Sequence, residues 1–215
     1  MAEAGAEAGS APERRSAFGQ ALAPRRLGPE EPRVRLHERG GLAIWQIAAW
    51  REAEVAPLRA ALAERLDVAL PEGPDAAGAG SHIAFRIAPR RWWLIEDEGR
   101  AAATALAEAL AGRAALTDLS HARSVLRLAG PASREVLAGL CRIDLHPQAL
   151  PAGRVVQTAL GQVPALLHAV DDEPCFDLYL PRSLAGSGLA AVLDAATEFG
   201  VALTQDAARE RSGPS

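Results

Sequence analysis

The chain has 215 residues, 49% of them hydrophobic and 23% charged, with a formal net charge of −4 at pH 7. This length allows one domain or two small ones, and so weak a charge argues against nucleic acid or an anionic membrane as the main partner. All 23 basic residues are arginine, which excludes a Schiff-base lysine and the lysine of a phosphate-binding P-loop.

Two cysteines, Cys141 and Cys175, lie far apart in the sequence and match no metal-binding spacing. We expect two reduced, at least partly buried thiols, with a single disulfide as the alternative. The first nine residues lack the basic and apolar regions of a signal peptide, and no apolar stretch reaches membrane-spanning length. We therefore expect a cytoplasmic protein.

The two ends of the chain differ in composition from its middle. Residues 1–32 are rich in Ala, Gly, Pro and Arg, and four prolines interrupt any long helix, so we expect a disordered arm. Its arginines could contact an acidic partner or simply be solvated. Residues 204–215 have the composition of a flexible polar tail. The folded domain is then 33–203, with a subdivision near residue 120.

The first half of this domain alternates between strand and helix periodicity. A Pro/Gly-rich surface loop is expected over 71–80. The pattern predicts strands over 42–47, 83–87, 92–95 and 116–119, and helices over 52–66 and 100–111. The resulting order, β-α-β-β-α-β, is a ferredoxin-like split unit.

The second half restarts with a strand over 125–129 and a helix that begins at Pro131 and runs to about residue 140. A hairpin over 154–160 and 163–168, a strand over 176–180 and a helix over 189–199 follow. The predicted fold class is α+β, with two interlocked ferredoxin-like halves and mostly antiparallel sheets.

No motif for catalysis or metal binding is complete. The chain lacks a Gly-x-Ser-x-Gly nucleophile elbow and a dinucleotide fingerprint between a strand and a helix. Asp171-Asp172-Glu173 lacks the ligand spacing of a cation loop and is interpreted as a solvated turn. No histidine has zinc-ligand spacing to another His or Cys; the five are His37, His82, His121, His146 and His168. We therefore assign no catalytic and no metal residue.

Tryptophan and arginine gather in one stretch, at Arg90, Arg91, Trp92 and Trp93. Such a mixture occurs in proteins that bind single-stranded nucleic acid, but this chain is acidic. Trp and Arg are also favoured at the centres of protein interfaces. The candidates for a subunit interface are Trp45, Trp50, Arg90, Arg91, Trp92 and Trp93.

Several blocks resemble, in order, the gamma subunits of heterotetrameric sarcosine oxidase. They are residues 88–95 (APRRWWLI), 117–123 (TDLSHAR) with 128–131 (LAGP), 141–147 (CRIDLHP) and 176–183 (FDLYLPRS). The resemblance covers about Gly41 to Phe199. It implies a fold related to the folate-binding domain of the glycine-cleavage aminomethyltransferase.

The resemblance also implies a role. A gamma chain is a non-catalytic accessory subunit of an enzyme that demethylates sarcosine oxidatively to glycine, using O2 and tetrahydrofolate and giving H2O2 and 5,10-methylenetetrahydrofolate. It implies alpha, beta and delta subunits as partners and no cofactor on this chain. FAD, FMN, NAD, the folate site and a zinc ion would belong to those other subunits.

Asp177 is the position at which the expectation of no cofactor on this chain could prove wrong. In the aminomethyltransferases a Glu in the corresponding strand contacts the pterin ring, and a carboxylate can pair bidentately with such an edge. Two interpretations follow. Asp177 is either structural, accepting hydrogen bonds from the backbone or an arginine, or a folate contact in a stand-alone folate-binding protein of the aminomethyltransferase superfamily.

Overall fold

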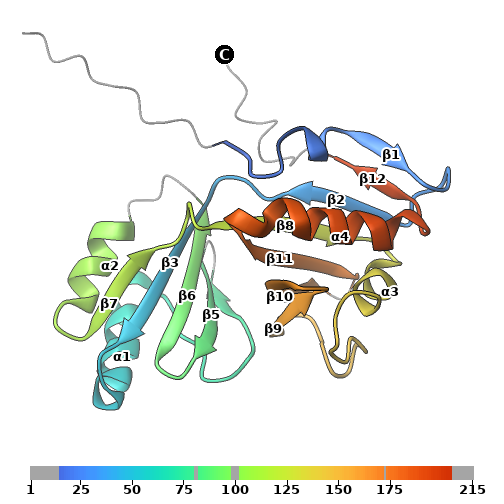
Figure 1. The fold of residues 1–215 in the computed structure, drawn as a ribbon. Coiled ribbons are helices and arrows are strands. Elements are labelled where there is room, and N and C mark those ends of the chain that lie inside the picture. The colour runs from blue at the N-terminus through green and yellow to red at the C-terminus, as the bar shows by residue number, and fades with distance from the viewer. Residues whose placement is uncertain (1–14, 80–81, 98–101, 172, 205–215) are drawn as a thin grey trace, which may run out of the picture.

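The fold was analysed in a computed structural model that describes residues 15–79, 82–97, 102–171 and 173–204. The chain forms two β-sheets (Figure 1). We call them sheet A, in the order β1-β12-β2-β8-β11-β10-β9, and sheet B, in the order β4-β5-β6-β3-β7. All strand pairs are antiparallel except β2 with β12. The predicted α+β class with mostly antiparallel sheets is confirmed.

Sheet B and its helices come from the first half of the domain. Two helices accompany it, α1 (Val55–Leu66) and α2 (Ala102–Leu110). Its strands are β3 (Leu42–Ala49), β4 (Ala77–Ala79), β5 (His82–Ala88), β6 (Arg91–Asp97) and β7 (Ala114–Asp118). The spatial order β5-β6-β3-β7 is that of a ferredoxin-like unit.

Sheet A repeats this plan in β10, β11, β8 and β12, with three strands added: β9, β2 and β1. Its helices are α3 (Ser133–Ala138) and α4 (Ala185–Thr197). Its strands are β1 (Arg25–Leu27), β2 (Val34–Glu38), β8 (Arg123–Ala129), β9 (Val155–Leu160), β10 (Val163–Asp171), β11 (Cys175–Pro181) and β12 (Val201–Leu203). Here β2, which precedes sheet B in the sequence, lies between β8 and β12. This insertion interlocks the two halves.

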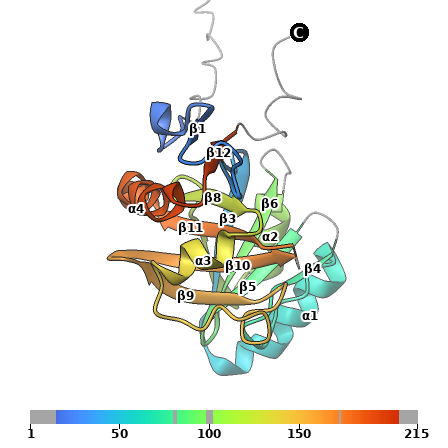
Figure 2. The same cartoon turned by 90° about the vertical axis from the view of Figure 1, so that its right-hand side faces the viewer.

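The two sheets face each other and each carries its helices on its outer face (Figures 1 and 2). One core cluster joins α3 and α4 to sheet A, and a second joins α1 and α2 to sheet B. A third lies between the sheets and includes Phe85, Trp93, Val125 and Tyr179. Strand β11 is therefore covered on both sides, which explains why Cys175 to Leu180 are all buried.

The expectation of a disordered arm over residues 1–32 is wrong from Arg15 onward. Phe18 and Leu22 are buried in the core cluster of sheet A and its helices, and β1 pairs with β12 as the edge strand of sheet A. The prolines do prevent a long helix, but the apolar residues between them find an open sheet edge to pack on. The expected disorder of residues 1–14 and the expected flexible tail over 205–215 fall on residues outside those that the structure describes.

Three smaller expectations can be compared with the structure. Cys141 and Cys175 are both buried and free, as predicted. Helix α3 begins at Ser133 rather than at Pro131, and α4 begins at Ala185, four residues before the predicted start. None of the helices in the described segments is both long and apolar enough to cross a membrane.

Candidate functional site

A row of polar residues crosses the inner face of sheet A. The strand register places His168, Asp177, Arg127 and His37 side by side on β10, β11, β8 and β2. Residues directly opposite each other in antiparallel strands lie on the same face of the sheet. The neighbours of Asp177 and Arg127 along their strands point into the helix-side core, so this row faces sheet B.

Asp177 is the centre of the row and only 1% of it is exposed. Arg127 donates from Nε to Oδ1 at 2.6 Å and from Nη2 to Oδ2 at 2.7 Å, a bidentate pair. Arg39, just after β2, donates from Nη1 to Oδ2 at 3.0 Å. Burial by itself would raise the pKa of Asp177, but the hydrogen bonds and charges of the two arginines outweigh it and hold that pKa below its ordinary value.

Two buried polar side chains beside this carboxylate have incomplete hydrogen bonding. Nδ1 of His168 and the hydroxyl of Tyr179 have no partner among the described residues. Both rings contact Phe85 of sheet B, with centroids 5.0 Å and 5.4 Å apart. Burial lowers the pKa of His168 to about 4 and raises the pKa of Tyr179. Both groups are therefore neutral near pH 7.

This arrangement limits what the carboxylate can do chemically. A general base or a pterin contact needs an oxygen with a free, accessible lone pair. Both oxygens of Asp177 instead accept charge-assisted bonds from arginine, and its buried position leaves almost no surface for a ligand. Asp177 therefore holds strands β8 and β11 and the segment after β2 together, and the groups that reach the surface are guanidinium groups.

The proposed interface residues separate into two sets. Trp92 and Trp93 are 2% and 7% exposed, so their expected place on a subunit interface is wrong. They are adjacent on β6, which is buried on both faces, and each ring therefore enters a different core. Trp45 is half-buried, and its indole donates to Oε1 of Glu96 at 2.9 Å.

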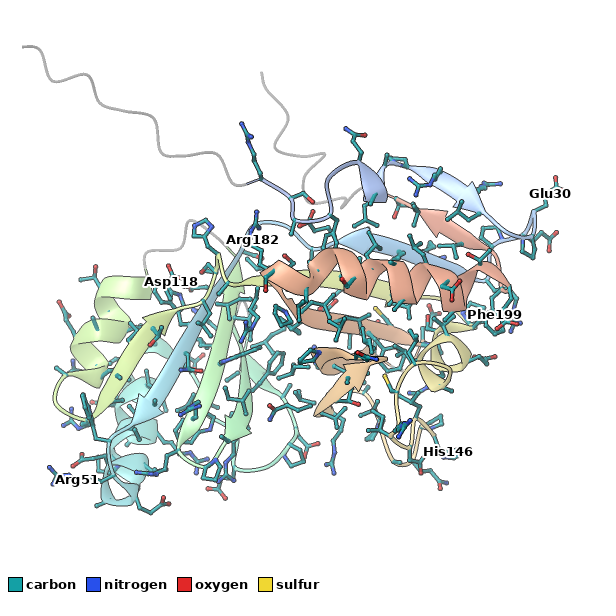
Figure 3. All side chains as sticks on the ribbon, in the orientation of Figure 1. Glu30, Arg51, Asp118, His146, Arg182 and Phe199 are labelled. Carbon is teal, nitrogen blue, oxygen red and sulfur yellow. The ribbon has the colours of Figure 1, made fainter. Side chains whose placement is uncertain are left out.

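The other residues of this set remain at the surface. Trp50 is 62% exposed, Arg91 is exposed, and Arg90 donates from Nη1 to the carbonyl of Trp50 at 2.9 Å. The next residue, Arg51, lies at the end of sheet B furthest from Arg182 (Figure 3). This patch is therefore separate from the polar row of sheet A.

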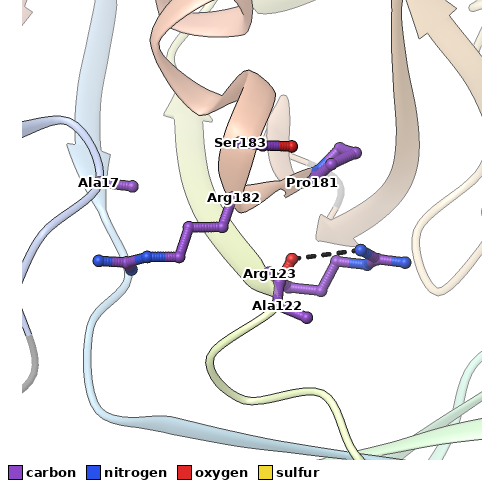
Figure 4. Close-up of a pocket in the computed structure, with 6 residues that line it drawn as sticks. All are labelled: Ala17, Ala122, Arg123, Pro181, Arg182 and Ser183. Carbon is purple, nitrogen blue, oxygen red and sulfur yellow. Dashed lines mark hydrogen bonds between the residues drawn. The ribbon is translucent and has the colours of Figure 1, made fainter.

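An open pocket of about 620 Å³ lies where the N-terminal segment meets the start of β8 and the end of β11; it is lined by Ala17, Ala122, Arg123, Pro181, Arg182 and Ser183. The guanidinium of Arg123 stacks on Trp93 at 5.0 Å, while Arg182 donates to the carbonyl of Arg15 at 2.6 Å. These two side chains extend in opposite directions (Figure 4). They therefore do not converge on a common ligand.

Comparison with known proteins identifies the family. Residues 79–211 match the GCVT N-terminal domain family. The sarcosine oxidase subunit gamma of an Arthrobacter species is 36% identical over 144 residues, which cover 65% of this chain and 70% of the relative. The chain belongs to the sarcosine oxidase gamma subunit family. The subunit gamma of Corynebacterium sp. strain P-1 is 34% identical over the same share of each chain.

Solved structures agree with this family. A chain of heterotetrameric sarcosine oxidase from Corynebacterium sp. U-96, solved in complex with pyrrole 2-carboxylate, is 28% identical with a TM-score of 0.75, over 86% of this chain and 96% of that one. Glycine cleavage system aminomethyltransferase T from Bartonella henselae is 21% identical with a TM-score of 0.56, over 75% of this chain and 46% of that one. This second likeness shows a shared fold.

Sequence reasoning selected Asp177 but missed its two partners. Arg127 interrupts the apolar run of β8, and Arg39 precedes two glycines at the crossover between the sheets. A signal for Arg127 did exist, because a charged residue inside a buried strand requires an opposite charge on a neighbouring strand. Nothing in the sequence indicates that Arg39 bonds to a residue 138 positions away.

Proposed function

We propose that this chain is a non-catalytic accessory gamma subunit of a heterotetrameric sarcosine oxidase. Its membership of the gamma subunit family, over most of the length of its relatives, carries the proposal. The neutralisation of Asp177 by arginine supports it, because the carboxylate that the family resemblance singles out as a possible pterin contact is engaged in structural bonds.

The proposed complex demethylates sarcosine oxidatively to glycine with O2 and tetrahydrofolate, giving H2O2 and 5,10-methylenetetrahydrofolate. In this proposal the partners are alpha, beta and delta subunits in the cytoplasm. FAD, FMN, NAD, tetrahydrofolate and zinc are held by those chains. The gamma chain contributes surface contacts that stabilise the assembly, and the exposed Trp50 with Arg90 and Arg91 is one surface suited to such contacts.

Co-expression with and without this chain tests the accessory role. The four subunits of the source organism would be produced together, and a parallel preparation would omit gamma. We expect the chain to elute with the flavin-containing subunits in size-exclusion chromatography, and its omission to reduce the yield and thermal stability of the complex. The flavin absorbance per assembled alpha–beta pair should be unchanged.

Two results would contradict this role. One is a failure of the chain to co-elute with the other subunits when all four are present. The other is a gamma-free preparation with the same stability and the same sarcosine-dependent production of H2O2 as the full complex.

The alternative, a stand-alone folate-binding protein, predicts that the isolated chain binds tetrahydrofolate. The structure disfavours it because both oxygens of Asp177 accept bonds from arginine and only 1% of the residue is exposed, which leaves almost no surface for the aminopyrimidine edge of a pterin. We expect calorimetric titration of the isolated chain with tetrahydrofolate to give no binding heat up to high micromolar ligand. Stoichiometric binding by the wild type, lost in an Asp177→Ala variant whose circular dichroism shows that it still folds, would establish the alternative.

A further inference from the structure

Within the described residues, sheet A has an open region on its inner face, formed by β1, β12, β2 and β8. The register places Arg26, Ala202, Arg35 and Ala129 in line across these four strands. Their strand neighbours, such as Val34, Leu36 and Val201, are buried in the core on the helix side. The inner face of these strands is therefore formed by arginines separated by small residues, and both Arg26 and Arg35 are exposed.

Sheet B covers only the other end of this face. Gln157 on β9 donates to the carbonyl of Ile87 at 2.6 Å, and the amide of Val155 donates to the carbonyl of Pro74 at 2.8 Å. Arg154 forms an ion pair with Asp75 at 3.0 Å. These contacts place sheet B over β9 and β10, whereas β1 and β12 lie at the upper right, away from sheet B (Figure 1).

The open region has an excess of positive charge in a chain with a net charge of −4. Four arginines, at positions 26, 35, 39 and 127, belong to it or border it. Among the described residues on the strands of this face the carboxylates are Asp177 and Asp171, two negative charges against the four positive ones. Neither Arg26 nor Arg35 forms an ion pair within the described part of the chain.

The guanidinium groups of Arg39 and Arg127 form the inner border of this region. Nη1 of Arg39 and Nη2 of Arg127 both bond to Oδ2 of Asp177, so the two groups converge. A guanidinium carries five N–H donors, and in the described structure several of theirs have no acceptor. The side chains of Arg39 and Arg127 are 22% and 24% exposed, so these donors are accessible from outside.

Two arginines on one carboxylate leave this cluster with a net positive charge that is partly removed from water. A partly desolvated charge is stabilised by a hydrogen-bonded counter-ion. A second carboxylate would supply it, since its planar pair of oxygens matches the donor geometry of a guanidinium.

We propose that the open inner face of sheet A, from Arg26 and Arg35 to the paired guanidinium groups of Arg39 and Arg127, docks an acidic segment of another subunit of the complex. An Asp or Glu side chain of that segment accepts hydrogen bonds from Arg39 and Arg127. The occupant is a protein segment because the charges are spread over β1, β2, β8 and the segment after β2, on a sheet face of small residues, whereas a small anion needs a concave site. This inference rests on the proposed function.

Charge reversal at the two outer arginines tests the docking surface. Arg26→Glu and Arg35→Glu leave the bonds to Asp177 intact, because neither side chain takes part in them. Arg142→Glu is the matched control, since Arg142 is also exposed but follows α3 on the other side of sheet A. Binding of each full-length chain to immobilised alpha, beta and delta subunits would be followed by biolayer interferometry at 50 mM and 300 mM NaCl.

We expect each reversal to lower the association rate constant about tenfold at low salt, because like charges then face each other, and to weaken its salt dependence. Arg142→Glu should bind like the wild type. Arg39→Gln, which keeps donors but removes a charge, should raise the dissociation rate while the thermal midpoint of the isolated chain shows that it still folds.

The outcomes separate this inference from the proposed function. If the wild-type chain does not bind the other subunits, both are overturned. If it binds and both reversals bind equally well, only the docking surface is overturned. Two further results would overturn the acidic subunit segment as the occupant of this face. If millimolar sodium acetate raises the thermal midpoint of the isolated chain and the reversals leave subunit binding unchanged, the face binds a small carboxylate. If the chain sediments as a dimer and Arg35→Glu makes it a monomer, the face binds a second copy of the chain.

Discussion

At the scale of single residues, the most consequential group is the carboxylate of Asp177. Replacement by Asn keeps the size of the side chain but leaves the buried ends of Arg39 and Arg127 without a counter-charge. Removal of one partner from a buried ion pair is strongly destabilising. We expect Asp177→Asn to lower the free energy of unfolding by about 3 kcal/mol, measured by urea denaturation at pH 7.

Asp171→Asn is the control for this change. Asp171 lies on the neighbouring strand β10 but is exposed, so its loss should alter stability by less than about 0.5 kcal/mol. Equal stabilities of the wild type and Asp177→Asn would show that the arginines do not depend on this carboxylate.

His168 gives the protein a specific dependence on pH. Burial lowers the pKa of His168 from 6.5 to about 4 in the folded chain, so between these values the unfolded state binds a proton that the folded state does not. The stability that depends on a neutral His168 is fully present above pH 6.5 and is lost as the pH falls towards 4. The loss should reach about 3 kcal/mol in urea titrations across this range.

Substitution separates His168 from other titrating groups. In His168→Leu the slope of stability between pH 6.5 and 4 should be flatter by nearly one proton, whereas His121→Leu, at an exposed position, should keep the wild-type slope. Asp177 affects stability at lower pH. Because its pKa is lowered in the folded chain, its carboxylate contributes stability at pH values above its pKa in the unfolded chain, and this stability is lost only as the pH falls below that value. A wild-type slope in His168→Leu would exclude a buried neutral imidazole.

At the scale of secondary structure elements, the junction between β8 and α3 depends on a glycine. Gly130 has a φ of +120°, and a Cβ atom there would lie 2.5 Å from the carbonyl oxygen of Arg33, the residue just before β2. We expect Gly130→Ala to lower the free energy of unfolding by about 2 kcal/mol, through backbone strain and separation of β2 from β8. Chemical denaturation measures the change.

Gly139 at the end of α3 provides the comparison. Its φ of −72° suits any residue, and the nearest atom to a new Cβ is 3.5 Å away. Gly139→Ala should therefore be neutral or stabilise the protein slightly. If both alanine variants were equally stable, the close approach of β2 to this turn would be contradicted.

The elements also show where sequence periodicity is informative. Along β11, Phe176, Leu178 and Leu180 alternate as a strand face, and that strand is present. The same alternation would normally place Asp177 and Tyr179 in solvent. They are buried because sheet B covers their face, and residues distant in the sequence form that cover.

At the scale of the whole molecule, the two sheets share one core. Phe85 of β5 is fully buried there and contacts the rings of both His168 and Tyr179 on sheet A. We expect Phe85→Ala to lower the free energy of unfolding by about 4 kcal/mol, because the cavity weakens the only apolar core between the sheets in the described structure.

Two probes report whether the halves unfold together. All four tryptophans lie between residues 45 and 93, in or beside sheet B, so fluorescence follows that half, while far-ultraviolet circular dichroism follows both. We expect the two transitions to coincide in the wild type and to shift together in Phe85→Ala. Separate transitions in the wild type would mean that the halves are independent domains.

Much of the fold follows from the sequence by itself. Apolar periodicity predicts the helices and eight of the strands, but not the short strands β1, β2, β4 and β12. The order of the predicted elements indicates ferredoxin-like units, because local spacing decides which residues can share one face of a helix or strand. The sequence blocks also indicate the family. These inferences depend only on neighbouring residues and on their order along the chain.

The tertiary structure decided what the order alone leaves open. Strand β2 enters the second sheet rather than the first, residues 15–32 pack instead of extending, and Trp92 and Trp93 are core rather than surface. The hydrogen bonds from Arg127 and Arg39 to Asp177 are likewise decided only by the tertiary structure. In each case the free energy comes from contacts between distant segments, so no local pattern encodes the outcome.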